Sequence, residues 1–178
     1  FDKMVFGCLG RLSKEKNFIQ PVRVFNSLCN LSFKLKIMGK KSNQYDLILN
    51  ESIKNKKINI IKESTNIDEF FSKIDFLIIP SLFEGCPNVL FEAFIRKTPC
   101  IISEKANSDF FVKNKINGFV YDGSDLDLKV TLQKIKNYDN KRIDEICKDA
   151  FNYVSQKFNI SSMTSNYENL FVKIDEEN

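Results

Sequence analysis

One stretch of the sequence, residues 76–103, constrains the fold most. It opens with an apolar run, Phe76–Ile79, that is too short for a helix and is closed by Pro80, so the run predicts a buried strand. A polar loop follows, then an apolar segment, Asn88–Ile95, and a second short apolar run, Cys100–Ile102. This order predicts a strand, a loop, a helix and a strand, which is the parallel crossover of an α/β sheet.

Two carboxylates are expected to face one cleft in this unit. Glu84 lies just outside the carboxyl end of the predicted strand, where open α/β sheets bind ligands, and Glu92 lies about one turn into the helix. Pro87 suits the first helical position, and the backbone N–H groups that follow it suit a phosphate. A nucleotide sugar, with hydroxyls and phosphates, would satisfy this mixture. The three amides belong to Asn88, Val89 and Leu90.

The polar residues of this stretch form a pattern that is typical of one enzyme family. They are Pro80, Ser81, Glu84, Gly85, Pro87, Glu92, Ala93, Pro99 and Ser103. The pattern resembles the signature of the retaining glycosyltransferases of family 4, whose hallmark is two glutamates separated by seven residues. The resemblance runs from about Met4 to about Tyr121. The alternative is an ordinary crossover with two solvated glutamates.

A group of cations follows the first predicted strand, Met4–Leu9. Arg11, Lys14 and Lys16 would gather at the carboxyl edge of that strand, which suits a pyrophosphate. The family has Gly-Arg and Glu-Lys elements here, and the resemblance implies that Arg11 and Lys16 hold the donor diphosphate. The alternative is that both are solvated surface charges. The matching residues are Gly10, Arg11, Glu15 and Lys16.

Periodicity and turn residues predict the remaining elements. Ser13 or Asn17 could cap the first helix, and Asn66 could cap the short helix that leads into Phe76. The resemblance implies that the segment after the third strand passes the nucleobase, although an exposed loop would look the same. That segment is Ile61, Lys62 and Glu63. The further strands are Phe33–Met38, Ile58–Ile61 and Phe119–Tyr121, a surface helix is Asn43–Lys54, and the apolar faces of two last helices are residues 143–154 and 163–174.

After Ser103 the sequence departs from the family pattern. The family usually has a glycine pair here and then a third acid before its Asn-Gly, which Asn117-Gly118 matches. This chain has no glycine pair, Asp109 falls one residue from the position of that acid, and Lys97 replaces a usual glycine. These departures concern the loop at the donor sugar.

Composition excludes several other classes of protein. The chain has 178 residues, is 43% hydrophobic and carries a net charge of +4, which is ordinary for a globular domain and too mild to indicate nucleic-acid binding. The absence of histidine excludes Ser-His-Asp and Cys-His catalysis and histidine-ligated zinc. No apolar run approaches the roughly 18 residues of a membrane helix. Five cysteines without CxxC spacing are expected to be reduced core residues: Cys8, Cys29, Cys86, Cys100 and Cys147.

We therefore predict an α/β fold with a Rossmann-like parallel sheet and helices on both faces, and the resemblance implies that it is the C-terminal half of a GT-B fold. The resemblance also implies that residues 1–158 form the domain that binds the nucleotide-sugar donor and that residues 159–178 form a helix that packs back on an N-terminal domain. The resemblance implies that Glu92 accepts from the ribose hydroxyls and that Glu84 holds sugar hydroxyls and stabilises the cationic anomeric carbon. It also implies that Gly85, Cys86 and the amides after Pro87 line the donor site.

The resemblance implies a retaining, metal-independent hexosyltransferase that uses a UDP- or GDP-linked sugar. A glycan or a lipid-linked acceptor, bacterial surface polysaccharide synthesis and a cytoplasmic place at the inner membrane surface are the expected setting. Because the acceptor site normally lies in the other domain, we expect this chain alone to bind donor but to transfer little or no sugar. The alternatives are an epimerase or phosphorylase of the same fold, a non-catalytic nucleotide-binding module, and an interaction domain that binds no nucleotide.

Overall fold

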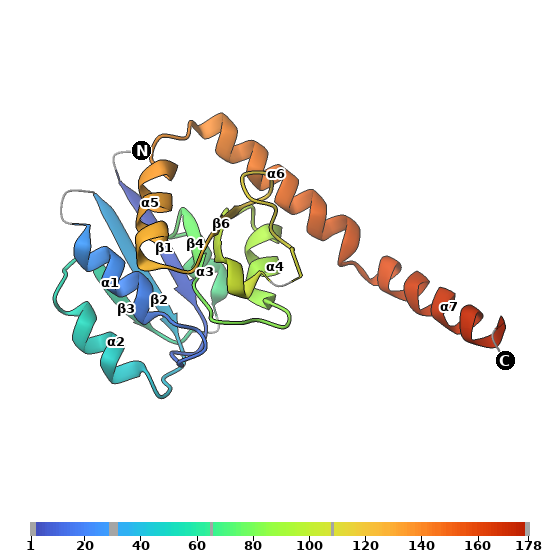
Figure 1. The fold of residues 1–178 in the computed structure, drawn as a ribbon, viewed down its shortest axis with the longest axis horizontal. Coiled ribbons are helices and arrows are strands. Elements are labelled where there is room, and N and C mark those ends of the chain that lie inside the picture. The colour runs from blue at the N-terminus through green and yellow to red at the C-terminus, as the bar shows by residue number, and fades with distance from the viewer. Residues whose placement is uncertain (1–2, 29–31, 65, 108, 177–178) are drawn as a thin grey trace.

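The computed structural model describes residues 3–28, 32–64, 66–107 and 109–176. It contains one six-stranded parallel sheet in the order β3-β2-β1-β4-β5-β6, which confirms the predicted fold class (Figure 1). The strands are β1 Met4–Leu9, β2 Phe33–Gly39, β3 Ile58–Lys62, β4 Phe76–Ile79, β5 Cys100–Ser103 and β6 Phe119–Tyr121. The helices are α1 Ile19–Ser27, α2 Tyr45–Ser52, α3 Ile67–Phe71, α4 Asn88–Ile95, α5 Asp125–Ile135, α6 Asn140–Lys157 and α7 Ile160–Glu176, with a short 3₁₀ turn, η1, at Glu104–Ala106.

The strands feed two cores, one on each face of the sheet. In β4, Phe76 and Ile78 pack with α1, α2 and α5, whereas Leu77 and Ile79 pack with α3 and α4. This alternation follows from the period of two along a strand, and both faces are apolar because helices cover both. Helix α6 spans the two cores, since Ile146 belongs to the first and Val154 to the second.

Helix α4 ends in a backbone conformation that explains why the family pattern has a glycine where this chain has Lys97. Lys97 has a left-handed φ of 55°. The N–H of Lys97 donates to the carbonyl of Phe94, and the N–H of Thr98 donates to that of Ala93, which is the Schellman arrangement in which glycine is usual. Lysine therefore occupies a position that favours glycine.

Two local predictions were wrong. Helix α1 begins at Ile19, later than a cap at Ser13 or Asn17 requires, and its N-cap, Phe18, makes no side-chain hydrogen bond. The Asn17 side chain instead donates to the carbonyl of Pro80. Pro87 is the N-cap of α4 rather than its first helical residue. The Asn66 cap is confirmed, because its side chain accepts from the N–H of Glu69.

Helix α7 extends away from the sheet and its helices (Figure 1). The apolar residues predicted as its docking face are about half exposed or more: Met163, Tyr167, Leu170, Phe171 and Ile174. None of the described helices is long and apolar enough to cross a lipid bilayer.

Candidate functional site

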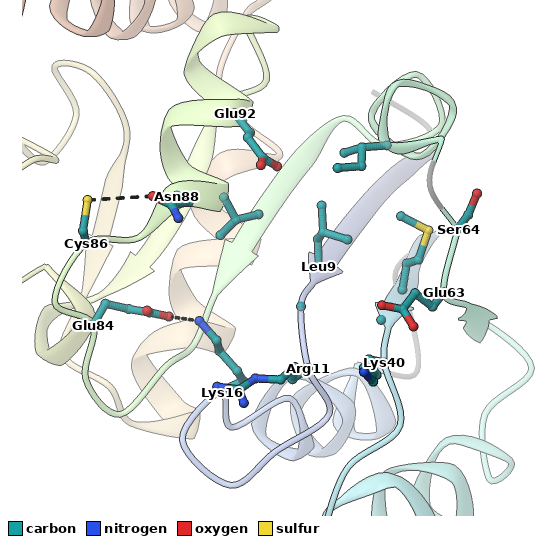
Figure 2. Close-up of a pocket in the computed structure, with 15 residues that line it drawn as sticks. Leu9, Arg11, Lys16, Lys40, Glu63, Ser64, Glu84, Cys86, Asn88 and Glu92 are labelled. Carbon is teal, nitrogen blue, oxygen red and sulfur yellow. Dashed lines mark hydrogen bonds and ion pairs between the residues drawn. The ribbon is translucent and has the colours of Figure 1, made fainter. Parts of the chain in front are cut away.

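A cleft of about 390 Å³ lies at the carboxyl edge of the sheet (Figure 2). Its walls come from the segments that follow β1, β2 and β3 and from the loop and helix that follow β4. The order of the strands reverses between β1 and β4, and in open α/β sheets this switch point is where ligands bind. Four segments that are distant in the sequence thus meet at one site.

Two glycines allow β1 and β2 to meet at the floor of the cleft. Gly10 has a φ of 146°, a backbone conformation that side chains disfavour. A Cβ added to Gly39 would lie 1.6 Å from the carbonyl oxygen of Gly10, so no larger residue fits at position 39 without moving the backbone. The N–H of Gly10 donates to the carbonyl of Met38 across the same junction.

A partly buried ion pair joins the two sides of the cleft. Lys16 Nζ lies 2.6 Å from Glu84 Oε1, and their side chains are only 23% and 11% exposed. Figure 2 shows Lys16 reaching from the segment after β1 to Glu84 in the loop after β4. The N–H of Leu82 donates to the carbonyl of Glu15 over 2.8 Å. Together with the bond from Asn17 to Pro80, these contacts fasten the two loops to each other.

The other predicted cation, Arg11, also lines the cleft but is far more exposed than Lys16. Its guanidinium lies 3.6 Å from the Glu15 carboxylate. The exposed Arg11 is therefore the cation at the mouth of the cleft, whereas Lys16 is the cation at its wall.

Helix α4 contributes Glu92, Asn88 and Val89 to the wall. The N–H of Asn88 donates to the carbonyl of Cys86, and the N–H of Leu90 donates to that of Pro87, so two of the three amides expected to be free are already hydrogen-bonded. The bond of Leu90 is the short i→i+3 bond of a tight first helical turn, and the bond of Asn88 spans two residues, as in a γ-turn. Val89 is the remaining candidate of the three for an anion.

The other predicted site residues are distributed around this wall. Pro87 and Leu90 are buried, Gly85 is exposed, and none of the three lines the cleft. Cys86 does line it and is exposed, so the prediction that it belongs to the core was wrong. Cys8, Cys100 and Cys147 are buried free thiols as predicted, and burial raises the pKa of Cys147 to about 11. Cys29 lies outside the described residues.

At the end of the cleft formed by β2 and β3, the sequence predicted only part of the lining. Glu63 lines the cleft, whereas Ile61 packs against the core and the side chain of Lys62 lies outside the described part. Asp109 is exposed and is not a lining residue. The rule that ligands bind at carboxyl strand ends, applied to β2 and β3, could have found most of the missed residues. These are Leu9, Met38, Gly39, Lys40, Ser64 and Ile67.

Within the described residues, no group of three or more cysteine, aspartate or glutamate side chains is arranged to hold a metal ion. The cleft instead combines three carboxylates, Glu63, Glu84 and Glu92, with the cations of Arg11, Lys16 and Lys40. Such a mixture can accept hydrogen bonds from hydroxyls and donate them to phosphate oxygens.

Comparison with known proteins places this site in a family context. The chain is 25% identical over 179 residues to the Escherichia coli UDP-Gal:alpha-D-GlcNAc-diphosphoundecaprenol alpha-1,3-galactosyltransferase, which covers 96% of this chain and 46% of that protein. It is 23% identical over 161 residues to the capsular polysaccharide biosynthesis glycosyltransferase CapM of Staphylococcus aureus, which covers 88% of this chain and 41% of that protein. The chain thus spans less than half the length of these relatives.

Solved structures share the fold. A glycosyltransferase from Rickettsia africae matches all of this chain over 49% of its own, with a TM-score of 0.84 and 15% identity. Anabaena HepE in complex with UDP and glucose matches 97% of this chain over 49% of its own, with a TM-score of 0.82 and 16% identity. The C-terminal domain of a group 1 glycosyltransferase, LpcC of Francisella tularensis, matches 88% of this chain over 87% of its own, with a TM-score of 0.76 and 18% identity.

The fold is therefore that of the C-terminal Rossmann-like domain of GT-B proteins. The family model "Glycosyl transferases group 1" matches residues 2–146, which include the whole cleft. This chain belongs to the group 1 glycosyltransferase family.

Proposed function

We propose that this chain is the donor-binding domain of a retaining glycosyltransferase of family 4 and that its cleft binds a nucleoside-diphosphate sugar. The observation that carries the proposal is the meeting of Arg11, Lys16, Glu84 and Glu92 with the start of helix α4 in one cleft. A structural neighbour in complex with UDP and glucose supports it. The mixture of acids, cations and helix amides matches the chemistry of a sugar joined to a diphosphate.

In this proposal Arg11 and Lys16 bind the diphosphate. Arg11 provides a planar set of donors at the mouth of the cleft and Lys16 a point charge at its wall. Because two of the α4 amides are already bonded, these side chains supply most of the positive charge. They also stabilise the negative charge that grows on the leaving diphosphate during transfer.

Glu92 and Glu84 bind the other parts of the donor. Glu92 accepts from the ribose hydroxyls, and Glu84 accepts from hydroxyls of the sugar and stabilises the positive charge that develops at the anomeric carbon. The chemistry then depends on positioning and electrostatics rather than on a protein nucleophile. We propose no metal cofactor, so donor binding should survive chelation with EDTA.

The relatives suggest the wider reaction. Their names describe transfer of galactose to a lipid diphosphate acceptor and synthesis of a capsular polysaccharide. We propose hexosyl transfer to a glycan or lipid-linked acceptor in bacterial surface polysaccharide synthesis, at the cytoplasmic face of the membrane. The acceptor site lies in an N-terminal domain on which residues 159–178 pack, so the purified chain alone should give little or no transfer.

A thermal-shift titration with UDP, GDP and ADP tests the proposal, because a ligand that binds only the folded state raises the midpoint temperature of thermal unfolding. One nucleotide should stabilise the protein, and Arg11→Ala and Glu92→Gln should each weaken that response. Glu145→Gln is the matched control, since this glutamate lies on helix α6 and pairs with Arg142 outside the cleft. An equal response in all four proteins would refute the assigned site.

A further inference from the structure

A chain of hydrogen bonds stands behind the Glu84 carboxylate. The hydroxyl of Ser81 donates to Glu84 Oε1 over 2.7 Å. The hydroxyl of Ser103 donates to the carbonyl of Ser81 over 2.6 Å and accepts from the N–H of Ala106 over 3.2 Å. These three hydrogen bonds thus link the 3₁₀ turn after β5 to the cleft.

Both serines lie at the carboxyl ends of neighbouring strands. Ser103 is the last residue of β5, Ser81 follows β4, and these two strands pair in parallel. Ser81 is 1% and Ser103 is 2% exposed. A buried hydroxyl needs a hydrogen-bond partner, and removal of one partner leaves the other unsatisfied. Because Ser81 is buried, loss of the hydrogen bond from its hydroxyl to Glu84 is costly.

The same carboxylate oxygen accepts a second bond. Lys16 Nζ lies 2.6 Å from Glu84 Oε1, so Ser81 and Lys16 both donate to one atom. Lys16 has a long flexible side chain, whereas Ser81 is short and buried beside a strand. A diphosphate would compete with Glu84 for the Lys16 ammonium, but it would not displace the Ser81 hydroxyl.

We propose that Ser81 is a positioning residue, which holds the Glu84 carboxylate toward the donor sugar while Lys16 binds the diphosphate. Ser103 in turn holds Ser81 in place, because the Ser103 hydroxyl donates to the backbone carbonyl of Ser81. This inference rests on the proposed function, because it requires that Glu84 contacts the sugar. Loss of the Ser81 hydroxyl should weaken recognition of the sugar without weakening recognition of the nucleotide.

Isothermal titration calorimetry separates these two contributions. The probes are UDP, GDP and ADP and then UDP-galactose, UDP-glucose, UDP-N-acetylglucosamine, GDP-mannose and ADP-glucose. The quantity compared is the ratio of the dissociation constant of a nucleotide to that of its sugar derivative. Ser81→Ala should lower this ratio by about tenfold or more, the scale of one hydrogen bond to a charged group. The affinity for the bare nucleotide should change less than about twofold, because that hydrogen bond holds Glu84 and not the diphosphate.

Two further variants keep the test decisive. Ser81→Thr retains a hydroxyl and should restore most of the ratio, whereas a purely structural defect would persist. Ser52→Ala is the matched control, since Ser52 is 3% exposed and its hydroxyl donates to the carbonyl of Leu49 in α2, outside the cleft. An unchanged ratio in Ser81→Ala, or an equal loss of nucleotide and sugar affinity, would overturn the positioning role.

The outcomes also separate this inference from the proposed function. If the wild-type chain binds a nucleotide but no sugar derivative binds more tightly, the role of Glu84 and this inference are both wrong, while the diphosphate site stands. If no nucleotide binds at all, the donor-binding proposal is wrong for this chain, and the positioning role of Ser81 is wrong as well.

Discussion

Helices α6 and α7 follow each other in the chain, and each has one apolar face, yet only one face is covered. In α6 most of the apolar side chains are buried, and Ile146 is 0% exposed. In α7 the corresponding side chains are exposed, and Leu170 is 50% exposed. Periodicity therefore predicts that a helix forms and which of its faces is apolar. It does not show whether the element that buries this face belongs to the same chain.

The largest expected effect tests this contrast directly. Ile146→Ala should lower the free energy of unfolding by about 2–5 kcal/mol, because it leaves a cavity in a packed core. The equivalent change in α7, Leu170→Ala, should cost within about 0.5 kcal/mol, as at other exposed positions. Urea denaturation followed by circular dichroism measures both. A large cost for Leu170→Ala would mean that the α7 face is buried in solution, for example by self-association.

The boundary between the two helices should show an intermediate effect. The ring centroid of Phe158 lies 4.4 Å from that of Phe91 on α4 and 5.9 Å from that of Phe111. Because Phe158 is 46% exposed, Phe158→Ala should cost roughly 1–2 kcal/mol, less than the 3–5 kcal/mol of a buried phenylalanine. Phe171→Ala on α7 is the matched control and should be nearly neutral. Equal costs for the two variants would contradict the boundary.

A third change concerns the junction of α4 with α6. Lys97→Gly should raise the free energy of unfolding by about 0.5–1 kcal/mol, because glycine adopts the left-handed conformation without the strain of a Cβ. This gain in stability is reduced because the variant loses a cation–π contact, in which Lys97 Nζ lies 5.4 Å from the ring centroid of Phe151 on α6. Thermal unfolding would measure it.

Lys97→Ala provides the comparison for that change. Alanine also loses the contact with Phe151 but keeps the Cβ in the left-handed conformation, so this variant should be slightly less stable than wild type. If both variants shift the midpoint in the same direction, conformational strain at position 97 is not the cause.

The sequence predicted most of the fold because its strands are short apolar runs bounded by turn residues. All six strands were predicted: β1, β4 and β6 match to the residue, and β2, β3 and β5 each extend one residue further than predicted. The pairing order could not be read from such runs, because they do not show that β1 pairs with β4, which is the one pair of neighbouring strands in the described sheet that is not consecutive in the chain. The resemblance to a known family supplied the expected architecture.

At the site, the sequence predicted which charged residues gather but not how they contact one another. It assigned Lys16 and Glu84 to different parts of a ligand, whereas the structure pairs them at 2.6 Å. That distance depends on two loops held together by backbone bonds such as Leu82 to Glu15, which carry no side-chain signature. The bonded amides of Asn88 and Leu90 escaped prediction for the same reason.

The smallest expected effect contrasts helix α5, which is fastened by a polar contact, with α7. Arg23 on α1 donates two hydrogen bonds to Asp125 at the start of α5, and this guanidinium, more than the Gln20 amide, holds the pKa of Asp125 below its ordinary value of 3.8. A carboxyl group whose pKa is lower in the folded state stabilises the fold at any pH above its unfolded pKa. That stabilisation is lost as the pH falls through the folded pKa.

Because the side chains of Arg23 and Asp125 are both about half exposed, the ion pair should contribute only about 0.2–1 kcal/mol. Asp125→Asn should therefore reduce the free energy of unfolding by that amount at pH 7, and the difference from wild type should shrink as pH falls below about 4. A difference that stays constant from pH 7 to pH 3 would assign the loss to helix capping or packing rather than to the ion pair.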